Sequence, residues 1–254
     1  MRRPTSTSGT GRGRLTDLRA DDVATYDAAS HDAVSHDAVL FDLDGVLTPT
    51  AEVHMRAWAA LFRPFLATFN GVQPYGDSDY FDYIDGKQRY EGVAALLRSR
   101  GIELPWGDPS DTPDAATVCG LGNRKDAAFN QVLRDEGVAP YPGSVAFLEL
   151  LEARGVDVAV VSSSRNATKV LAAAGLAKRF TVVVDGLTAA AEGLPSKPDP
   201  ATYLSAARRL GVEPSRAVVI EDALSGVEAG ARGGFGLVIG VDRGAGADAL
   251  RTAG

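Results

Sequence analysis

The sequence predicts an α/β fold: a doubly wound parallel sheet with a small helical domain inserted after the first strand. Two observations support this prediction. From residue 143 to the end, short runs rich in Val, Ile and Ala alternate with segments of helical character, which is typical of parallel βαβ units. Before residue 141, apolar residues recur at helical spacing over a long stretch, which indicates helices. With 254 residues, 45% of them hydrophobic, the chain can form a full core and a second small domain.

The first predicted strand is the apolar run Ala38-Val39-Leu40-Phe41, which is followed by Asp42-Leu43-Asp44-Gly45. A short β-branched and aromatic run that ends near Gly is typical of a buried parallel strand stopping at a tight turn. Ligands of open α/β sheets bind outside the carboxyl ends of the strands. Because Asp42 and Asp44 share one side of an extended backbone, we expect both carboxylates to face that crevice.

Two carboxylates held this close repel each other unless a cation lies between them or one is protonated. Magnesium suits such a hard oxygen site. The arrangement fits phosphoryl transfer, with Asp42 as the nucleophile and Asp44 as the proton shuttle. From these residues alone, the alternative is a strand-end Asp that caps a turn beside an unrelated acid.

The inserted segment is predicted to be helical. Its first helix has an apolar stripe, which we interpret as core of this helical unit and not as a binding surface. We expect Pro64 to kink or divide that helix. Further helices are predicted over residues 90–100 and 123–136, and residues 104–113, with three prolines and a glycine, are predicted to be a loop. The stripe consists of Met55, Trp58, Leu61, Phe62, Phe65, Leu66 and Phe69.

Four later strands are predicted near residues 156–162, 180–184, 216–220 and 235–239, with helices between them. Polar residues follow two of them. The run Ser162-Ser163-Ser164-Arg165-Asn166 follows the first, and Glu221-Asp222 follows the third. In Ser196-Lys197-Pro198-Asp199-Pro200, a lysine stands beside two prolines that restrict the loop.

These segments resemble, in order, the four motifs of the haloacid dehalogenase superfamily, whose members form an aspartyl-phosphate. Residues Val39 to Thr50 resemble the first motif, Ser162 the second, Lys197 the third and Glu221-Asp222 the fourth, metal-binding one. Pro49 stands where an Asp is usual in the first motif. The resemblance implies the catalytic residues Asp42, Asp44, Ser162 and Lys197. It also implies a Mg²⁺ cofactor at Asp42, Asp44, Glu221 and Asp222.

Within the superfamily, the chain from Asp37 onward resembles the β-phosphoglucomutase group. The start of the inserted helix around His54, the loop Asp85-Gly86-Lys87-Gln88-Arg89, the segment Asn123-Arg124-Lys125 and the triplet Ser164-Arg165-Asn166 carry this resemblance. It implies a Rossmann-like core over residues 37–52 and 140–254 and a helical cap over residues 53–139. The implied substrate-binding residues are His54, Gly86, Lys87, Gln88, Arg89, Lys125, Ser163, Ser164, Arg165 and Asn166.

The activity that the resemblance implies is conversion of β-D-glucose 1-phosphate to glucose 6-phosphate through a 1,6-bisphosphate. Such a mutase needs a second anion site, and the resemblance assigns Arg89, Ser164, Arg165 and Asn166 to it. Lys87 and Arg89 have the alternative interpretation of a solvated charged loop. Two other functions stay open: a sugar- or polyol-phosphate phosphatase of the same fold, and a non-catalytic binding protein. A non-catalytic binding protein would have no need for charged residues whose burial costs free energy, and such residues are present here: Asp42, Asp44, Lys197 and Asp222.

The composition limits the classes of molecule that the protein is expected to bind. A net charge of -7 argues against a nucleic-acid or anionic-membrane partner, and no apolar stretch approaches the length of a membrane-spanning helix. The single Cys119 cannot support a disulfide framework, which favours a reducing cytoplasm. We expect a monomer whose partner is a sugar phosphate substrate. Residues 1–36, rich in Ser, Thr, Gly and Arg, are predicted to be a flexible leader in preference to a targeting segment.

Overall fold

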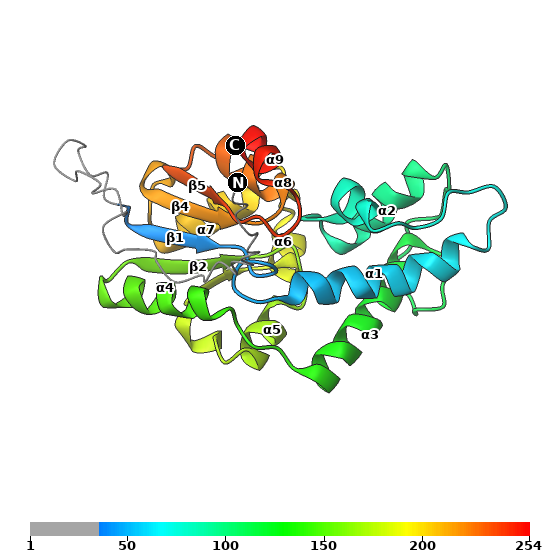
Figure 1. The fold of residues 1–254 in the computed structure, drawn as a ribbon, viewed down its shortest axis with the longest axis horizontal. Coiled ribbons are helices and arrows are strands. Elements are labelled where there is room, and N and C mark those ends of the chain that lie inside the picture. The colour runs from blue at the N-terminus through cyan, green and yellow to red at the C-terminus, as the bar shows by residue number, and fades with distance from the viewer. Residues whose placement is uncertain (1–35) are drawn as a thin grey trace, which may run out of the picture. The chain divides into compact units, whose positions relative to one another are not determined.

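The computed structural model describes residues 36–254, so the predicted leader, apart from its last residue, lies outside the described residues. The strands of this part of the chain form one five-stranded sheet in the order β3-β2-β1-β4-β5 (Figure 1). All neighbouring strands are parallel, which confirms the predicted α/β fold class. The strands are β1 (Ala38–Phe41), β2 (Asp157–Val161), β3 (Val182–Val184), β4 (Ala217–Glu221) and β5 (Leu237–Gly240).

The middle strand, β1, aligns the ends of its two neighbours. Phe41 pairs with Val160 of β2 and with Ile220 of β4. Because the strands are parallel and in this register, the chain leaves all three at the same edge of the sheet. The residues that follow these strands are therefore brought side by side, although they are far apart in the sequence.

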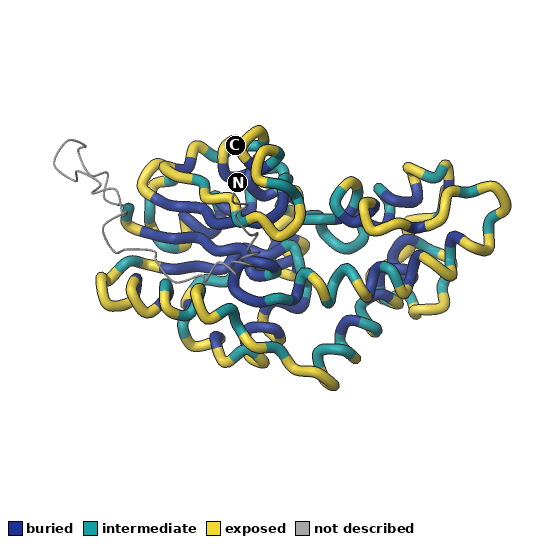
Figure 2. The backbone as a smooth tube through the Cα atoms, viewed as in Figure 1, coloured by how far each residue is buried: buried dark blue, intermediate teal, exposed yellow. Residues whose placement is uncertain are grey.

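Helices cover both faces of the sheet, because alternate residues of its buried strands point to opposite sides. Val39 and Phe41 pack in one cluster with α4 (Pro142–Ala153) and α5 (Ala167–Ala173). Leu40 packs in another with α7 (Ala201–Leu210) and α8 (Leu224–Arg232). Figure 2 shows β1, β2 and β4 as the buried centre of the sheet. The remaining elements are α6 (Gly186–Glu192), α9 (Ala247–Ala253) and the 3₁₀ turns η3 (Ala177–Arg179) and η4 (Pro214–Arg216).

The segment between β1 and β2 is helical, as predicted, and has its own apolar cluster drawn from residues 58–121. Trp58 stacks on Phe62 at 5.6 Å between ring centroids, and Phe62 stacks on Tyr75 at 5.8 Å. We keep the name cap for this unit. Its elements are α1 (Thr50–Leu66), the π-helical turn η2 (Tyr80–Ile84), α2 (Arg89–Ser99) and α3 (Val118–Glu136).

Three details of the cap differ from the sequence-based expectation. Pro64 was expected to kink or divide the first helix, and the division is wrong: α1 runs through Pro64 and ends at Leu66. The proline removes one backbone donor close to the end of the helix, and the helix continues through this loss. Helix α3 begins at Val118 and not at 123, because the Thr117 hydroxyl caps it by accepting from Gly120 N at 2.9 Å. The turn η2 was not predicted. The loop over residues 104–113 has no helix or strand, as expected.

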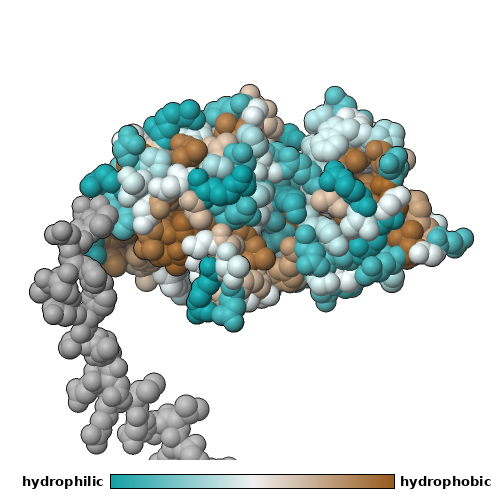
Figure 3. Space-filling model, turned by 90° about the horizontal axis from the view of Figure 1, so that it is seen from above, coloured by the Kyte–Doolittle hydropathy of each residue, from teal (hydrophilic) through white to brown (hydrophobic). Residues whose placement is uncertain are grey.

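The surface of the described part carries no continuous apolar belt on the face shown in Figure 3, where hydrophilic residues separate the hydrophobic patches. No helix within residues 36–254 has both the length and the apolar character needed to cross a membrane.

Candidate active site

The loop after β1 is a tight turn that holds Asp42 and Asp44 at the edge of the sheet. The backbone N–H of Asp42 donates to Ile220 O at 2.9 Å, and Gly45 N donates to Thr48 O at 2.8 Å. Gly45 has a φ of 87°, and a Cβ atom there would overlap the Asp222 carboxylate, so only glycine suits the position. The turn is closed by its own backbone hydrogen bonds even though Pro49 follows it.

Three buried carboxylates converge beside this turn. One oxygen from each of Asp42, Glu221 and Asp222 lies within 4.8 Å of the others. Glu221 is held in place because its Oε2 accepts from the backbone N–H groups of Asp222 and Ala223, both at 2.9 Å. The Asp222 carboxylate makes no ion pair within residues 36–254. These residues come from the ends of two adjacent strands, β1 and β4, as the parallel register requires.

Lys197 supplies the positive charge of this cluster and is itself buried. Its Nζ donates to Asp42 Oδ1 at 2.6 Å, to Val161 O at 3.3 Å and to Glu221 Oε1. The Tyr203 hydroxyl also donates to Glu221 Oε1, at 3.1 Å. The two carboxylates beside Lys197 hold its pKa well above its ordinary value against the opposing effect of burial.

The electrostatics of the three carboxylates fit a divalent cation. Burial raises the pKa of Asp42, and Glu221 adds to the rise while Lys197 opposes it. Burial also raises the pKa of Asp222, with further contributions from Glu221 and Asp42. One lysine cannot balance three carboxylates, and a small hard cation with oxygen ligands would relieve this repulsion. The donor set therefore suits Mg²⁺.

The Asp44 carboxylate is not one of the three that converge, and it lies beside groups that can donate to it. Thr50 Oγ1 donates to its Oδ1, Ser162 Oγ lies 3.4 Å from its Oδ2, and His54 Nε2 lies 3.5 Å from its Oδ1. Burial would raise the pKa of Asp44, but His54 and the Thr50 hydrogen bond outweigh it and hold the pKa below its ordinary value. Asp44 is therefore a carboxylate at neutral pH, ready to accept a proton.

His54 connects Asp44 to a buried lysine of the cap. His54 Nδ1 is hydrogen-bonded to Lys125 Nζ, and the His54 ring stacks on Phe129 with centroids 4.1 Å apart. Lys125 Nζ also lies 5.0 Å from the centroid of the Trp58 ring. Burial, with Arg89 nearby, lowers the pKa of Lys125 to about 7. Burial likewise lowers the pKa of His54, and Lys125 adds to the fall while Asp44 opposes it.

The loop that precedes α2 brings the cap against the core at two serines. Ser163 Oγ donates to Gly86 O at 2.6 Å, and Ser225 Oγ donates to Asp85 O at 3.2 Å. Gly86 has a φ of 71°, and a Cβ atom there would overlap the Ser225 side chain. The loop can approach the core this closely only with glycine at that position. Gln88 adds a third contact, from its Nε2 to Leu194 O at 3.3 Å.

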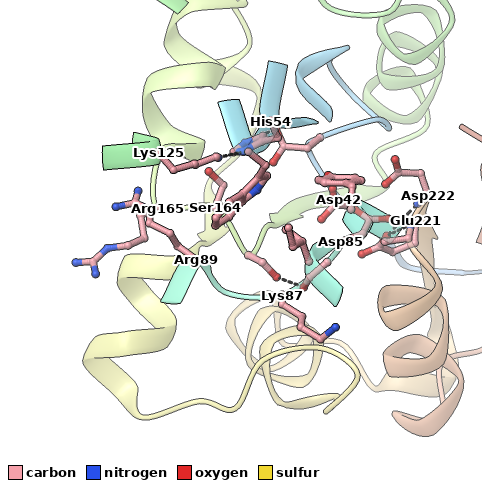
Figure 4. A pocket seen from close by; sticks show the side chains of 17 residues that line it. Asp42, His54, Asp85, Lys87, Arg89, Lys125, Ser164, Arg165, Glu221 and Asp222 are labelled. Atoms are coloured by element: carbon pink, nitrogen blue, oxygen red, sulfur yellow. Dashed lines mark hydrogen bonds and ion pairs between the residues drawn. The ribbon is translucent and has the colours of Figure 1, made fainter. Parts of the chain in front are cut away.

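Cations gather at the other end of the same pocket. Arg89 and Lys125 come from the cap and Arg165 from the core, and in Figure 4 they lie across the pocket from the three carboxylates. Arg165 Nη1 donates to the Tyr90 hydroxyl at 3.4 Å. Arg89 pairs with Asp126, which the sequence analysis did not single out, at 2.6 Å.

Most of the sequence-predicted site residues line this one pocket. Four are not among the lining residues: Ser162, Gln88, Asn166 and Lys197. Lining residues that sequence reasoning missed are Trp58, Tyr80, Ile84, Asp85 and Ala223. Trp58 belongs both to the apolar cluster of the cap and to the pocket wall, so interpreting it as core alone was incomplete. Asp85 belongs to the loop that the sequence analysis named, but it was not assigned to the site. Burial raises the pKa of Asp85 to about 6, with Glu221 adding to the rise.

Comparisons with known proteins agree with this fold and site. A model of haloacid dehalogenase-like hydrolases matches residues 36–234, and the chain belongs to that family. Within it, the predicted likeness to the β-phosphoglucomutase-like group is confirmed. The chain is 48% identical over 210 residues to a β-phosphoglucomutase of Mycobacterium tuberculosis, covering 80% of each protein. It is 31% identical over 208 residues to a β-phosphoglucomutase of Bacillus subtilis, covering 81% of this chain and 83% of that protein.

A solved structure with the same fold is CbbY from Rhodobacter sphaeroides in complex with xylulose-(1,5)bisphosphate. It matches with a TM-score of 0.63 and 27% sequence identity, covering 82% of this chain and 88% of that chain.

Proposed function

We propose that this protein is a β-phosphoglucomutase that converts β-D-glucose 1-phosphate to glucose 6-phosphate through an aspartyl-phosphate and a 1,6-bisphosphate. The observation that carries the proposal is one pocket with two differently charged ends. Asp42, Glu221 and Asp222 lie at one end, and Arg89, Lys125 and Arg165 at the other (Figure 4). A sugar bisphosphate has two anionic groups, so it needs both a reacting site and a second anion site. The M. tuberculosis and B. subtilis relatives named β-phosphoglucomutase support the same reaction.

At the reacting end, the Asp42 carboxylate is placed to attack phosphorus and form the acyl-phosphate, with the leaving hydroxyl departing on the opposite side. Mg²⁺ held by Asp42, Glu221 and Asp222 would neutralise charge on the transferred phosphoryl group. Lys197, 2.6 Å from Asp42 Oδ1, holds the nucleophile and offers its charge to a phosphoryl oxygen. Ser162 follows β2, and its hydroxyl is near enough to Asp44 to bond a phosphoryl oxygen beside it.

Asp44 is the group that moves the proton. In the phosphoenzyme, its carboxylate would take the proton of the attacking sugar hydroxyl, and in the reverse direction the acid form would protonate the leaving oxygen. Thr50 and His54 direct its Oδ1, which leaves Oδ2 toward Ser162 and the reacting centre. Because its pKa lies below the ordinary value, Asp44 is ionised at neutral pH, the form that the base role requires.

The cationic end of the pocket is the feature that favours a mutase over a hydrolase. A mutase must hold the phosphate that is not being transferred, release the bisphosphate and rebind it with its ends exchanged. Arg89 and Lys125 belong to the cap and Arg165 to the core, so a phosphate bound among them would fasten the two together. Closure of this kind excludes water, which would otherwise hydrolyse the aspartyl-phosphate.

A phosphatase acting on a small sugar or polyol phosphate is the second candidate. The family model that matches the chain is one of hydrolases, and the reacting end described above serves equally well for attack by water. The two functions differ in what becomes of the phosphoryl group. In a coupled assay of β-glucose 1-phosphate with a trace of the bisphosphate, the mutase yields glucose 6-phosphate, whereas the phosphatase yields free phosphate.

Replacing Arg89 with Ala tests the second anion site. The loss of the charge-assisted contact between Arg89 and the second phosphate is expected to cost about 3 kcal/mol of transition-state stabilisation. This lowers kcat/KM with β-glucose 1,6-bisphosphate roughly 10²-fold. Phosphorylation of the enzyme by acetyl phosphate, which has no second phosphate, should hardly change. Arg98→Ala is the matched control, because Arg98 lies exposed at the end of the same helix. Bisphosphate turnover of Arg89→Ala within a few-fold of the unmodified protein would favour the hydrolase.

Removal of divalent cations is expected to stop turnover, because three buried carboxylates would then face the phosphate with only Lys197 between them. Dialysis against a chelator followed by the coupled assay measures this, and added Mg²⁺ should restore the rate. Ca²⁺ should not restore it, since its longer and looser coordination misaligns an in-line attack. Full activity in excess chelator would refute the role given to Asp42, Glu221 and Asp222.

A further inference from the structure

A carboxylate outside the predicted site, Asp126 of α3, contacts two of the residues given to the second anion site. Its Oδ1 accepts from Arg89 Nη2 and from Asn166 Nδ2, both at 2.6 Å. Arg89 begins helix α2 of the cap, whereas Asn166 stands in the core just before α5. One oxygen atom therefore joins the cap to the core at the point where the second phosphate would bind.

Neighbouring contacts show that this junction is a defined interface. Lys169 Nζ of α5 lies 3.3 Å from Asn130 Oδ1 of α3, one helical turn after Asp126. Arg165 of the core donates to Tyr90 of the cap at 3.4 Å. Asp126 does not line the pocket itself, and neither does Asn166. The Asp126 carboxylate therefore holds Arg89 and Asn166 from outside the pocket, while Arg89 itself lines it.

We propose that Asp126 is a positioning residue that assembles the second anion site when the cap docks on the core. This inference rests on the proposed function, because it assigns the site to the phosphate that is not transferred. Without the Asp126 oxygen, Arg89 and Asn166 lose their common acceptor, and the Asn166 side chain keeps only the longer contact of its Oδ1 with Lys169 Nζ, at 3.3 Å. A bound phosphate would then have to order the Arg89 guanidinium itself, which weakens its binding.

Because Arg89 and Asn166 both donate to Asp126 Oδ1, two substitutions of Asp126 can separate the role of this acceptor from the role of the charge. The Asp126→Asn variant keeps an Oδ1 acceptor for both donors and loses only the charge, whereas Asp126→Ala loses the acceptor as well. We expect Asp126→Ala to raise the KM for β-glucose 1,6-bisphosphate about tenfold or more, with kcat much less affected. Asp126→Asn should stay within about threefold of the unmodified protein, and both variants should be phosphorylated by acetyl phosphate at the normal rate.

Asp135→Ala is the matched control, because Asp135 is an exposed aspartate of the same helix whose side-chain bonds within residues 36–254 are to Gln131 alone. A KM unchanged by Asp126→Ala would overturn the proposal. So would an equal loss in Asp126→Asn and Asp126→Ala, since the charge and not the shared acceptor would then matter.

Amide hydrogen exchange of the ligand-free protein separates this proposal from the proposed function. Residues 164–170 should exchange faster in Asp126→Ala than in Asp126→Asn or Asp135→Ala, because the contact that holds Asn166 is lost. If the unmodified protein fails to interconvert the glucose phosphates but shows this difference, the positioning role stands and the function is wrong. If exchange is the same in all variants, Asp126 does not position Asn166.

Discussion

An Asp42→Asn variant is expected to fold like the unmodified protein and to form no phosphoenzyme. An amide cannot attack phosphorus as a carboxylate oxygen does, so turnover should fall by roughly 10⁴-fold or more. The fold should survive because Lys197 keeps its contact with Glu221 and the amide oxygen of Asn can accept from Lys197 Nζ. The measurement is hydroxylamine-sensitive, acid-stable labelling by a phosphoryl donor, with thermal unfolding alongside.

Asp157→Asn serves as the matched control, because Asp157 is an exposed aspartate at the start of the adjacent strand β2. It should label and turn over normally. A hydroxylamine-sensitive label in the Asp42→Asn protein would show that another carboxylate is the nucleophile.

An Asp44→Asn variant is expected to lose about 10²–10⁴-fold in kcat, the usual contribution of a positioned general acid–base group. Asn can still accept from Thr50, so the loop geometry should be kept, but it can neither take nor give the proton of a sugar hydroxyl. The coupled mutase assay measures the loss.

Acetyl phosphate distinguishes this role from a structural one. Its leaving group, acetate, is a weak base that departs without being protonated, so phosphorylation of Asp42 by acetyl phosphate needs no acid. Asp44→Asn should therefore be labelled by acetyl phosphate at nearly the normal rate. If labelling and sugar turnover fall together, Asp44 does not act in proton transfer.

The strands of the core could be predicted from the sequence because each is marked by a short local pattern of residues. Short apolar runs bounded by turn residues mark all five strands to within a few residues. The cap was harder, because its helix starts depend on contacts that local pattern does not reveal. Gly120 and Gly122 are poor helix formers, so the sequence pattern did not indicate that α3 begins at Val118. In the structure, Thr117 caps this start. Pro64 did not divide α1, because it removes a single backbone donor and the helix ends two residues later.

Site residues that directly follow a strand could be predicted from the sequence. Those at the contact between the cap and the core were harder to predict. Asp42 and Glu221 were recognisable because each stands at a strand end, and the parallel register then brings them together. No local pattern indicates that Asp126 contacts Arg89 and Asn166, since these residues belong to three different elements. Nor could spacing alone show that the Asp44 carboxylate faces Thr50 and His54 while the other three acids converge.

The position of β1 in the middle of the sheet has a consequence for how the chain folds. Ala38 pairs with Asp157 on one side and with Ala217 on the other, so both partners of the strand are distant in sequence. The apolar cluster of the cap, by contrast, is complete by residue 121. Pairings of such long range must close large loops before they gain contacts, which makes them slow to form. During synthesis, the cap can therefore condense while β1 still lacks both neighbours, and Asp42 meets Lys197 and Glu221 only among the final steps.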